Sequence, residues 1–326
     1  MDHALAGNRD AVLVTPDGVA LDAIDEVVTG PLHQLRSLVA LLRPTHWIKG
    51  SLVLAVPLVT APVTALTHLP ALALTLLAFL AASSTVYVLN DLLDRHNDRL
   101  HPVKRLRPLA SGRVAPSAAR KLLAVLLLGT VGLLVAAPPL AALVIGGYLL
   151  MNAWYSAALK HQSLVDVSVV AAGFVLRALA GVFAVGLGAD PLLLICVYCA
   201  CVALSLGKRR HELAGLAADG QAGPGHRPVL SAYSVPFLDH VVVVHLVAAL
   251  ACYVAWIWQV SPPYGALGAG LTFPFAAFTV TRYLQLLMVE RSGGNPVEDL
   301  VRDRRLRVNV GLWGAALLPI FIAGAL

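Results

Sequence analysis

Three aspartates, Asp91, Asp94 and Asp98, stand at the end of a long apolar stretch, at positions i, i+3 and i+7. This spacing aligns three carboxylates along one face of a helix, where their mutual repulsion is costly beside lipid. A divalent cation relieves that repulsion, and Mg²⁺ combines one or two carboxylates with water and phosphate oxygens. Asn90 adds a neutral oxygen or orients a ligand. The pattern predicts a magnesium site at these four residues; the simpler alternative is a solvated helix terminus.

A basic segment follows the aspartates directly and contains Lys104, Arg105 and Arg107. The prolines around these residues and Gly112 prevent a continuous helix, so we expect a fixed loop close to the acids. Lys and Arg side chains bind phosphate oxygens. Acids for the metal and bases for the phosphates together predict a cradle for a diphosphate. A loop that rests on anionic lipid headgroups is the alternative.

A second group of charged residues follows in the next apolar stretches. Lys160 and Asp166 stand near the predicted inner surface, where they suit substrate or metal contacts. Asp166, Gly173 and Arg177 share one helix face, at i, i+7 and i+11. An arginine inside a membrane helix indicates a functional site by default, although pairing with a carboxylate inside the bundle explains Arg177 equally well.

A third basic group lies in the segment from Lys208 to Arg227. Arginine-rich loops close over anionic substrates, but they also serve membrane topology alone. Lys208, Arg209 and Arg227 are the better candidates for substrate contacts, and Arg210 is the weaker one. The four cysteines lie in apolar runs and are interpreted as small buried side chains without chemistry.

The elements that must position these residues follow from composition. The chain has 326 residues, of which 58% are hydrophobic and only 13% are charged, whereas soluble domains carry about a quarter charged residues. Four stretches of about forty residues contain no Lys, Arg, Asp or Glu, apart from Arg177 and Asp190 in one of them. Each stretch is broken near its midpoint by proline or glycine, which predicts a helical hairpin. Four hairpins and a final helix give an all-α integral membrane bundle of nine transmembrane helices over residues 41–326. Residues 1–40 are expected to form an acidic cytoplasmic extension.

The distribution of basic residues predicts the orientation. The 24 Lys and Arg residues concentrate in the N-terminal extension and near the loops after the even-numbered spans, while the four midpoint turns contain none. Because cytoplasmic loops retain Lys and Arg, we expect the N-terminus and the charged loops in the cytoplasm and the C-terminus outside. The net charge of +6 therefore reports topology, and no nucleic-acid partner is needed to explain it.

Two motifs carry a resemblance to a known family. The pattern NDxxDxxxD is met from Asn90 to Asp98, and residues 101–112 match HPxKRxRPxASG. These motifs resemble the UbiA-type prenyltransferase superfamily, and the second resembles its decaprenyl-phosphate phosphoribosyltransferase branch. The resemblance runs from about Leu42 to Trp313 and includes Arg43-Pro44 with Trp47 and Lys49, residues 155–181, Lys208-Arg209 with Glu212-Leu213, and residues 226–230.

There are departures from the family pattern. The aromatic prenyltransferases have a second acidic motif, DxxxD, but here Asp166 is followed four residues later by Val170. This departure favours the phosphoribosyl branch over prenyl transfer. Gly50 and Asn295 replace residues that are common in the branch, and neither replacement touches the aspartates.

The resemblance implies a transfer of 5-phosphoribosyl from phosphoribosyl diphosphate to decaprenyl or another polyprenyl phosphate in the plasma membrane, with Mg²⁺ as cofactor. The product of such enzymes is a precursor of cell-wall arabinan. In this scheme Lys104, Arg105, Lys160 and Arg227 neutralise phosphates, Tyr155 and Asp166 orient the ribose, and Lys49 meets the lipid phosphate. The rival hypotheses are prenyl transfer to an aromatic acceptor and a non-enzymatic transporter of divalent metal or lipid phosphate. Homo-oligomerisation is left open.

Overall fold

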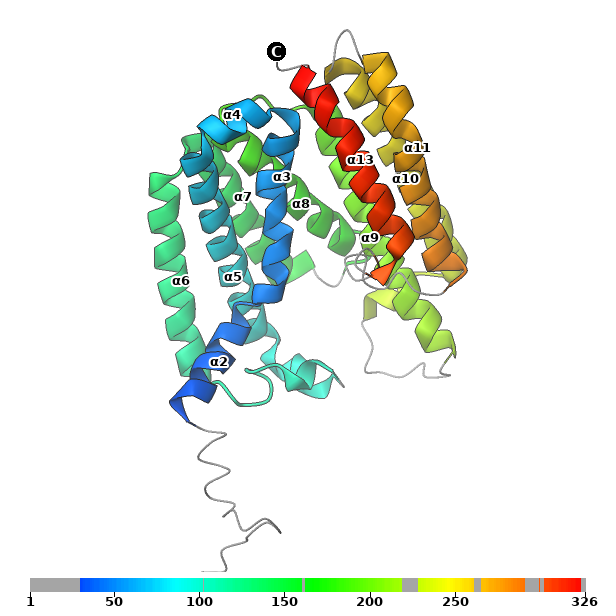
Figure 1. The fold of residues 1–326 in the computed structure, drawn as a ribbon. Coiled ribbons are helices and arrows are strands. Elements are labelled where there is room, and N and C mark those ends of the chain that lie inside the picture. Colours follow the sequence, from blue (N-terminus) through cyan, green and yellow to red (C-terminus); the bar gives the residue numbers. More distant parts are fainter. Residues whose placement is uncertain are drawn as a thin grey trace, which may run out of the picture.

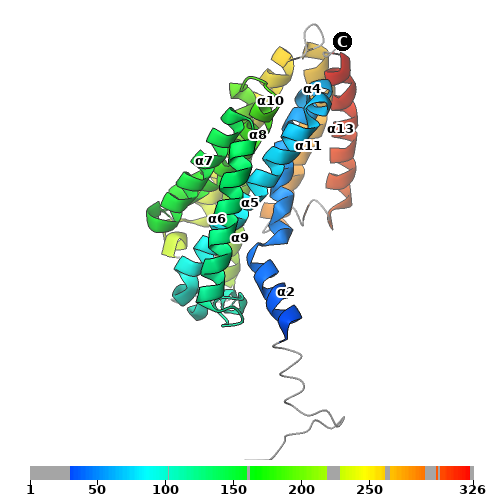
Figure 2. The same cartoon turned by 90° about the vertical axis from the view of Figure 1, so that its left-hand side faces the viewer.

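The computed structural model describes residues 30–101, 103–159, 162–218, 228–260, 265–290, 299 and 302–323, and over these residues it is entirely helical. Its α-helices form an elongated bundle (Figures 1 and 2). They are α2 (Pro31–Leu41), α3 (Ser51–Thr60), α4 (Pro62–Thr67), α5 (Leu69–Leu100), α6 (Pro116–Ala136), α7 (Pro139–Trp154), α8 (Val165–Ala184), α9 (Pro191–Ala218), α10 (Val235–Val260), α11 (Gly265–Met288) and α13 (Arg304–Ala323). Short tight helices are η1 (Pro44–Gly50), η2 (Lys104–Leu106) and η4 (Pro228–Ala232), and η3 (Tyr155–Leu159) is a π-helical turn that continues α7.

Among the described residues, six helices are long and apolar enough to cross a membrane: α5, α6, α8, α9, α10, and α7 together with η3. At three of the four predicted midpoints a proline begins a new helix, since Pro70 lies in the first turn of α5 and Pro139 and Pro191 open α7 and α9. The fourth midpoint, at residues 261–263, lies outside the described residues. The all-helical membrane fold is therefore confirmed. The nine-span count and the orientation of the termini stay predictions.

The first predicted span is not one continuous helix. The α3 helix ends at Thr60, Ala61 adopts an extended backbone (φ −150°, ψ 68°), and Pro62 begins α4. Proline lacks the N–H group that would continue the hydrogen-bonding ladder and disfavours helical geometry in the preceding residue. The chain therefore crosses this region in two short pieces of 10 and 6 residues.

The α8 helix lies at the centre of the bundle and belongs to both large hydrophobic cores. Its Ala180 and Ala184 pack with buried residues of α3, α5 and α7, and its Val167 and Ala171 pack with α9, α10 and α11. Figure 1 shows α3 to α7 on one side of α8 and α9 to α13 on the other. Charged side chains on α8 therefore lie between the two halves.

Helices α3 and α8 approach so closely that only glycine fits at their contact. A Cβ atom added to Gly181 would overlap the backbone carbonyl of Val53. Because this contact lies between backbones, no side-chain rotation relieves it. It fixes α3, and the η1 helix that precedes it, against the centre of the bundle.

A smaller core fixes the basic loop beside the acidic end of α5. Leu41 of α2, Val88 of α5, Leu109 and Val114 of the loop, and Ala119 of α6 are buried together. The predicted domain boundary near residue 40 falls at the end of α2, which packs on the membrane bundle. Residues 1–29 lie outside the described residues.

Candidate active site

Asp91 and Asp98 lie on one face of α5, as the spacing predicts, and a single arginine nitrogen joins them. Arg107 Nη1 donates to Asp98 Oδ2 at 2.6 Å and to Asp91 Oδ1 at 3.3 Å. Both aspartates are 3% exposed, so their negative charges depend on nearby cations, of which Arg107 is shared by the two. Asp94, between them on the same helix, is half-buried and also has a partner.

Arg43 is a second cation that binds Asp91. Its Nη2 donates to Asp91 Oδ1 at 2.5 Å, and its guanidinium lies 5.0 Å from the ring centroid of Tyr87. Arg43 connects α2 to η1 in the left-handed region, at φ 53°, which is uncommon for a residue with a side chain. This placement makes Arg43 a site residue that the motif analysis did not single out. The only signal in the sequence was its position before Pro44 in a segment that resembles the family.

The basic loop brings two of its three predicted cations to the acids. Lys104 Nζ lies 4.0 Å from Asp98 Oδ1, and Arg107 bridges the two aspartates as described. Arg105 is exposed on η2. A separate hydrogen bond attaches the loop to α5: Arg99 Nε donates to the carbonyl of Ala110 at 3.1 Å.

Asn90 is oriented by the π-helical turn at the end of α7. The hydroxyl of Ser156 has one proton, which it shares between two acceptors, Asn90 Oδ1 and the carbonyl of Asn152 at 2.7 Å. The π turn is a local widening of the helix, a feature that is frequent at functional sites. It places half-buried Tyr155 beside Ser156 on the segment that faces the end of α5.

Asp166 and Arg209, both predicted as substrate contacts, bind each other. Arg209 Nη2 of α9 donates to Asp166 Oδ2 at 2.9 Å, and its Nη1 donates to Glu212 Oε2 at 3.1 Å. Asp166 is 2% exposed, and its other oxygen, Oδ1, is buried without a hydrogen-bond partner in the described part of the chain. A buried carboxylate oxygen of this kind is free to accept from a ligand hydroxyl.

The approach to Asp166 is shaped by a strained residue. Leu164, at φ 65°, directs its backbone N–H to the Tyr233 hydroxyl at 2.6 Å. Burial raises the pKa of Tyr233 above its ordinary value, so this phenol stays protonated. Tyr233 thereby connects the start of α8 to the segment before α10.

Arg177 is 5% exposed and forms only neutral hydrogen bonds. Its Nη1 donates to the carbonyl of Gly173 at 2.8 Å, and its Nη2 lies 3.2 Å from the Tyr148 hydroxyl and 3.4 Å from Ser83 Oγ. In the described residues no carboxylate lies within ion-pair distance of Arg177. Pairing with an acid inside the bundle, one of the two interpretations of this residue, is therefore not found in the part of the chain that the structure describes.

Two further predicted cations, Lys49 and Lys208, lie on different elements and interact electrostatically with each other. Lys49 is half-buried at the end of η1, and Lys208 is exposed on α9. Burial, and then the positive charges of Arg177, Lys208 and Arg43, lower the pKa of Lys49 from its ordinary value. The field in this region is therefore strongly positive. The two remaining predicted residues, Lys160 and Arg227, lie outside the described residues.

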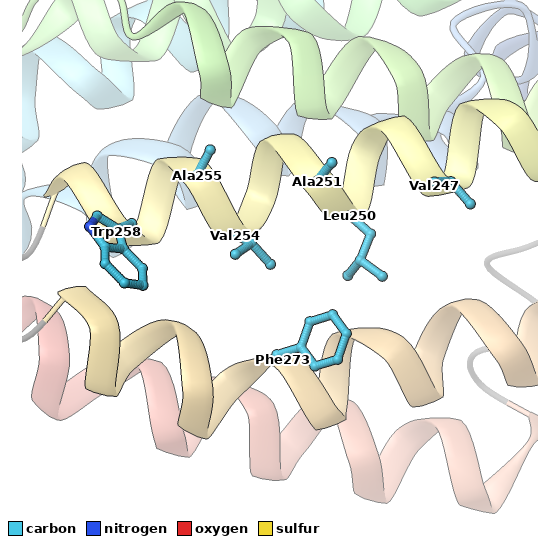
Figure 3. A pocket seen from close by; sticks show the side chains of 7 residues that line it. All are labelled: Val247, Leu250, Ala251, Val254, Ala255, Trp258 and Phe273. Carbon is cyan, nitrogen blue, oxygen red and sulfur yellow. The ribbon is translucent and has the colours of Figure 1, made fainter.

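An apolar groove between α10 and α11 is separate from these charged residues. Figure 3 shows Leu250 and Val254 of α10 pointing toward α11, from which Phe273 points back. The groove is lined by Val247, Leu250, Ala251, Val254, Ala255, Trp258 and Phe273. Without an ionisable side chain, this lining suits contact with hydrocarbon and offers no group for chemistry.

The acids fit a hard divalent cation by the chemistry of their donors. Oxygens of two buried carboxylates, from Asp91 and Asp98, already surround one cationic nitrogen of Arg107. Among the described residues, no three side chains of His, Cys, Asp or Glu converge closely enough to hold a metal by themselves. A metal held here would need ligands beyond the protein, as Mg²⁺ commonly has.

Fold and site together define a membrane-embedded helical protein with a charged site at one end of its bundle. The model of the UbiA prenyltransferase family matches residues 50–288, and the chain belongs to that family of membrane enzymes. It is similar to the decaprenyl-phosphate phosphoribosyltransferase of Mycobacterium tuberculosis, with 30% identity over 300 residues that cover 90% of this chain and 97% of the relative.

A second relative and a solved structure agree with this assignment. The decaprenyl-phosphate phosphoribosyltransferase of Corynebacterium glutamicum is 28% identical over 288 residues, which cover 87% of this chain and 86% of the relative. The fold is similar to that of a UbiA homolog from Archaeoglobus fulgidus bound to GPP and Mg²⁺, with a TM-score of 0.64 and 19% identity over 89% of this chain and 99% of that one.

Proposed function

We propose that the protein transfers the 5-phosphoribosyl group from phosphoribosyl diphosphate to decaprenyl phosphate or another polyprenyl phosphate, with release of diphosphate. The reaction takes place at the cytoplasmic face of the plasma membrane and depends on Mg²⁺. The observation that carries the proposal is the single Arg107 nitrogen held between Asp91 and Asp98. It supports the proposal because a cation of the kind that binds phosphate lies beside two carboxylates of the kind that hold Mg²⁺.

The leaving group binds at this cluster. When the donor enters, Arg107 exchanges the two carboxylates for diphosphate oxygens, and Lys104 turns from Asp98 toward the same phosphates. The carboxylates of Asp91 and Asp98 are then free to hold Mg²⁺, with Asp94 and Asn90 beside them. The metal ion supplies charge neutralisation for the departing diphosphate. Arg105, Lys160 and Arg227 add positive charge from the loops.

The ribose is oriented at the second cluster. Asp166 Oδ1 is buried and has no hydrogen-bond partner in the described residues, so it accepts a hydrogen bond from a ribose hydroxyl. Arg209 holds the other oxygen of Asp166 and so fixes the direction of the first. Tyr155, on the π turn, contacts the same sugar. These residues hold C1 of the ribose in line between nucleophile and leaving group.

The phosphate group of the acceptor lipid is itself the nucleophile. One of its anionic oxygens forms a bond to C1, while the bond from C1 to the diphosphate oxygen breaks and its electron pair leaves with the diphosphate. No proton has to be removed, so the reaction needs no general base. Catalysis then rests on positioning and on neutralising negative charge.

Two observations favour phosphoribosyl transfer over prenyl transfer to an aromatic acceptor. The second acidic motif of the aromatic prenyltransferases is incomplete here, because Val170 stands where its second aspartate would be. The remaining acid, Asp166, is bound to Arg209 and so is neutralised without a second metal ion. The names of two relatives whose similarity covers 87% or more of this chain support the same choice.

The test is an assay with purified protein, labelled phosphoribosyl diphosphate, Mg²⁺ and polyprenyl phosphate. Labelled lipid and released diphosphate are expected. Product formed only from a prenyl diphosphate and an aromatic acid would overturn the proposal in favour of prenyl transfer, and no turnover with either pair would favour a transporter. Asp94→Asn is expected to abolish turnover and to leave membrane insertion intact.

A further inference from the structure

Arg177 lies in an aromatic cage inside the bundle. Its Cζ lies 5.0 Å from the ring centroids of both Phe79 and Tyr148 and 5.3 Å from that of Phe174. These rings come from α5, α7 and α8, the helices whose ends carry Asp91, Tyr155 and Asp166. A cage of ring faces is a site that stabilises positive charge, and here the protein fills it with its own cation.

The charge of Arg177 is not neutralised within the described residues. Its hydrogen-bond partners are a carbonyl and two hydroxyls, and none of them carries a negative charge. Other buried arginines of the same bundle are paired: Arg210 has Asp239 at 2.9 Å, and Arg282 has Asp303 at 2.6 Å. A buried cation without a counter-ion is costly, so the arrangement calls for an anion from elsewhere.

Lys49 lies within range of the charge of Arg177 and has no ion pair in the described residues. The charges that act most strongly on it, Arg177, Lys208 and Arg43, are all positive. Lys49 is on η1, at the site end of the bundle, whereas Arg177 lies deeper, on α8. Both are positive charges, and they lie close enough for the charge of Arg177 to act on Lys49.

We infer that Arg177, with Lys49, determines acceptor specificity by selecting an anionic lipid head group and by excluding an allylic cation from the aromatic cage. This inference rests on the proposed function and deepens it. A prenyl transferase needs its aromatic surfaces to stabilise a developing carbocation. In this chain the rings of Phe79, Tyr148 and Phe174 hold a guanidinium, which repels such a cation and attracts a phosphate monoester.

The experiment measures binding without turnover. Purified protein in detergent is titrated with farnesyl phosphate and, separately, with farnesol, and thermal stabilisation is recorded. Wild type is expected to bind the phosphate at least about tenfold more tightly than the alcohol, since a hydrogen bond to a charged group is worth about that factor or more. Arg177→Gln and Lys49→Gln are each expected to reduce this preference about tenfold and to leave farnesol binding unchanged.

Three further variants separate specificity from structure. Arg177→Lys keeps the charge and is expected to retain most of the phosphate preference. Arg210→Gln removes an equally buried arginine that has a carboxylate partner, so it is expected to lower the melting temperature without changing the preference. Lys49→Gln affects a half-buried residue, and it tests the inference even if Arg177→Gln does not fold.

In turnover assays the two glutamine variants are expected to raise the KM for polyprenyl phosphate and to leave the KM for phosphoribosyl diphosphate unchanged. Folded glutamine variants that keep the full preference for farnesyl phosphate would overturn the inference. A wild-type protein that prefers the phosphate but transfers no phosphoribosyl group would instead overturn only the proposed function.

Discussion

Arg209 of α9 donates to Asp166 at the start of α8 across 2.9 Å, and this ion pair joins the two halves of the bundle. Both side chains are buried, at 10% and 3% exposure. Removing Arg209 leaves Asp166 buried and uncompensated, which costs about 3 kcal/mol or more. We expect Arg209→Gln to lower the free energy of unfolding by this amount. Asp166→Asn is expected to cost less, because Glu212 still pairs with Arg209, and the double variant is expected to lose less than the sum. Additive losses in a double-mutant cycle would show that the pair does not act as a unit.

Arg107 and Mg²⁺ compete for the same two carboxylates in the proposed mechanism. Arg107→Gln removes the cation that occupies the space between Asp91 and Asp98. In the absence of donor, this variant is expected to bind Mg²⁺ roughly tenfold more tightly than wild type, while its KM for phosphoribosyl diphosphate rises. Calorimetric titration with Mg²⁺ measures the first effect without any turnover.

Arg105→Gln is the matched control, because Arg105 is exposed and has no contact with the aspartates in the described residues. Its Mg²⁺ affinity is expected to equal that of wild type. An Arg107→Gln protein with unchanged or weaker Mg²⁺ binding would contradict the competition.

Removal of the metal tests the acidic cluster itself. Chelation by EDTA is expected to abolish turnover and added Mg²⁺ to restore it, because the leaving diphosphate is otherwise not neutralised. Asp98→Asn keeps the size of the side chain but loses one charge, so more Mg²⁺ is required for half-maximal activity. Full activity after exhaustive chelation would exclude the magnesium role.

The backbone contact at Gly181 predicts a sharp steric requirement. Gly181→Ala drives a methyl group into the carbonyl of Val53 and separates α3 from α8. Overpacking of this kind costs about 1–3 kcal/mol, and a lower melting temperature is the readout. Gly132→Ala on α6 is the control, because an added Cβ meets nothing within 4 Å there. It is expected to be neutral or to raise stability by up to about 1 kcal/mol through helix propensity.

The lowered pKa of His46 predicts how the stability of the protein depends on pH. Burial, followed by the positive charges of Lys49 and Arg43, lowers the pKa of His46 from 6.5 to about 4. A lowered pKa means that the unfolded chain takes up the proton first. Stability is therefore full above pH 6.5 and is lost as the pH falls toward 4. Thermal unfolding across this range is expected to show a smaller acid loss for His46→Gln than for wild type, and equal losses would contradict the assignment.

Local pattern predicted the helices and the acidic face well, because both depend on neighbours in sequence. The prolines at positions 70, 139 and 191 mark helix starts in the structure. The spacing of Asp91 and Asp98 placed both on one face, and they do share the Arg107 nitrogen. The basic loop was expected beside them and lies there.

Contacts between distant segments could not be predicted in the same way. Arg43 reaches Asp91 across 48 positions and depends on a left-handed backbone that periodicity does not encode. Asp166 and Arg209 were both assigned to substrate, and their mutual ion pair became visible only when α8 and α9 were placed together. For Arg177, helical spacing predicted its position inside the membrane helix and the helix face that it shares with Asp166. It did not predict that neutral and aromatic side chains surround it.

The break at Ala61 has a consequence for how the protein is made. A helix of 10 residues such as α3 rises only about 15 Å, half of the roughly 30 Å of hydrocarbon that a spanning helix crosses. During synthesis α3 is too short to partition into lipid alone. The smallest insertable unit that contains α3 is therefore α3 and α4 together with the 32-residue α5, so that Lys49 and Asp91 are delivered to the same membrane face in one step.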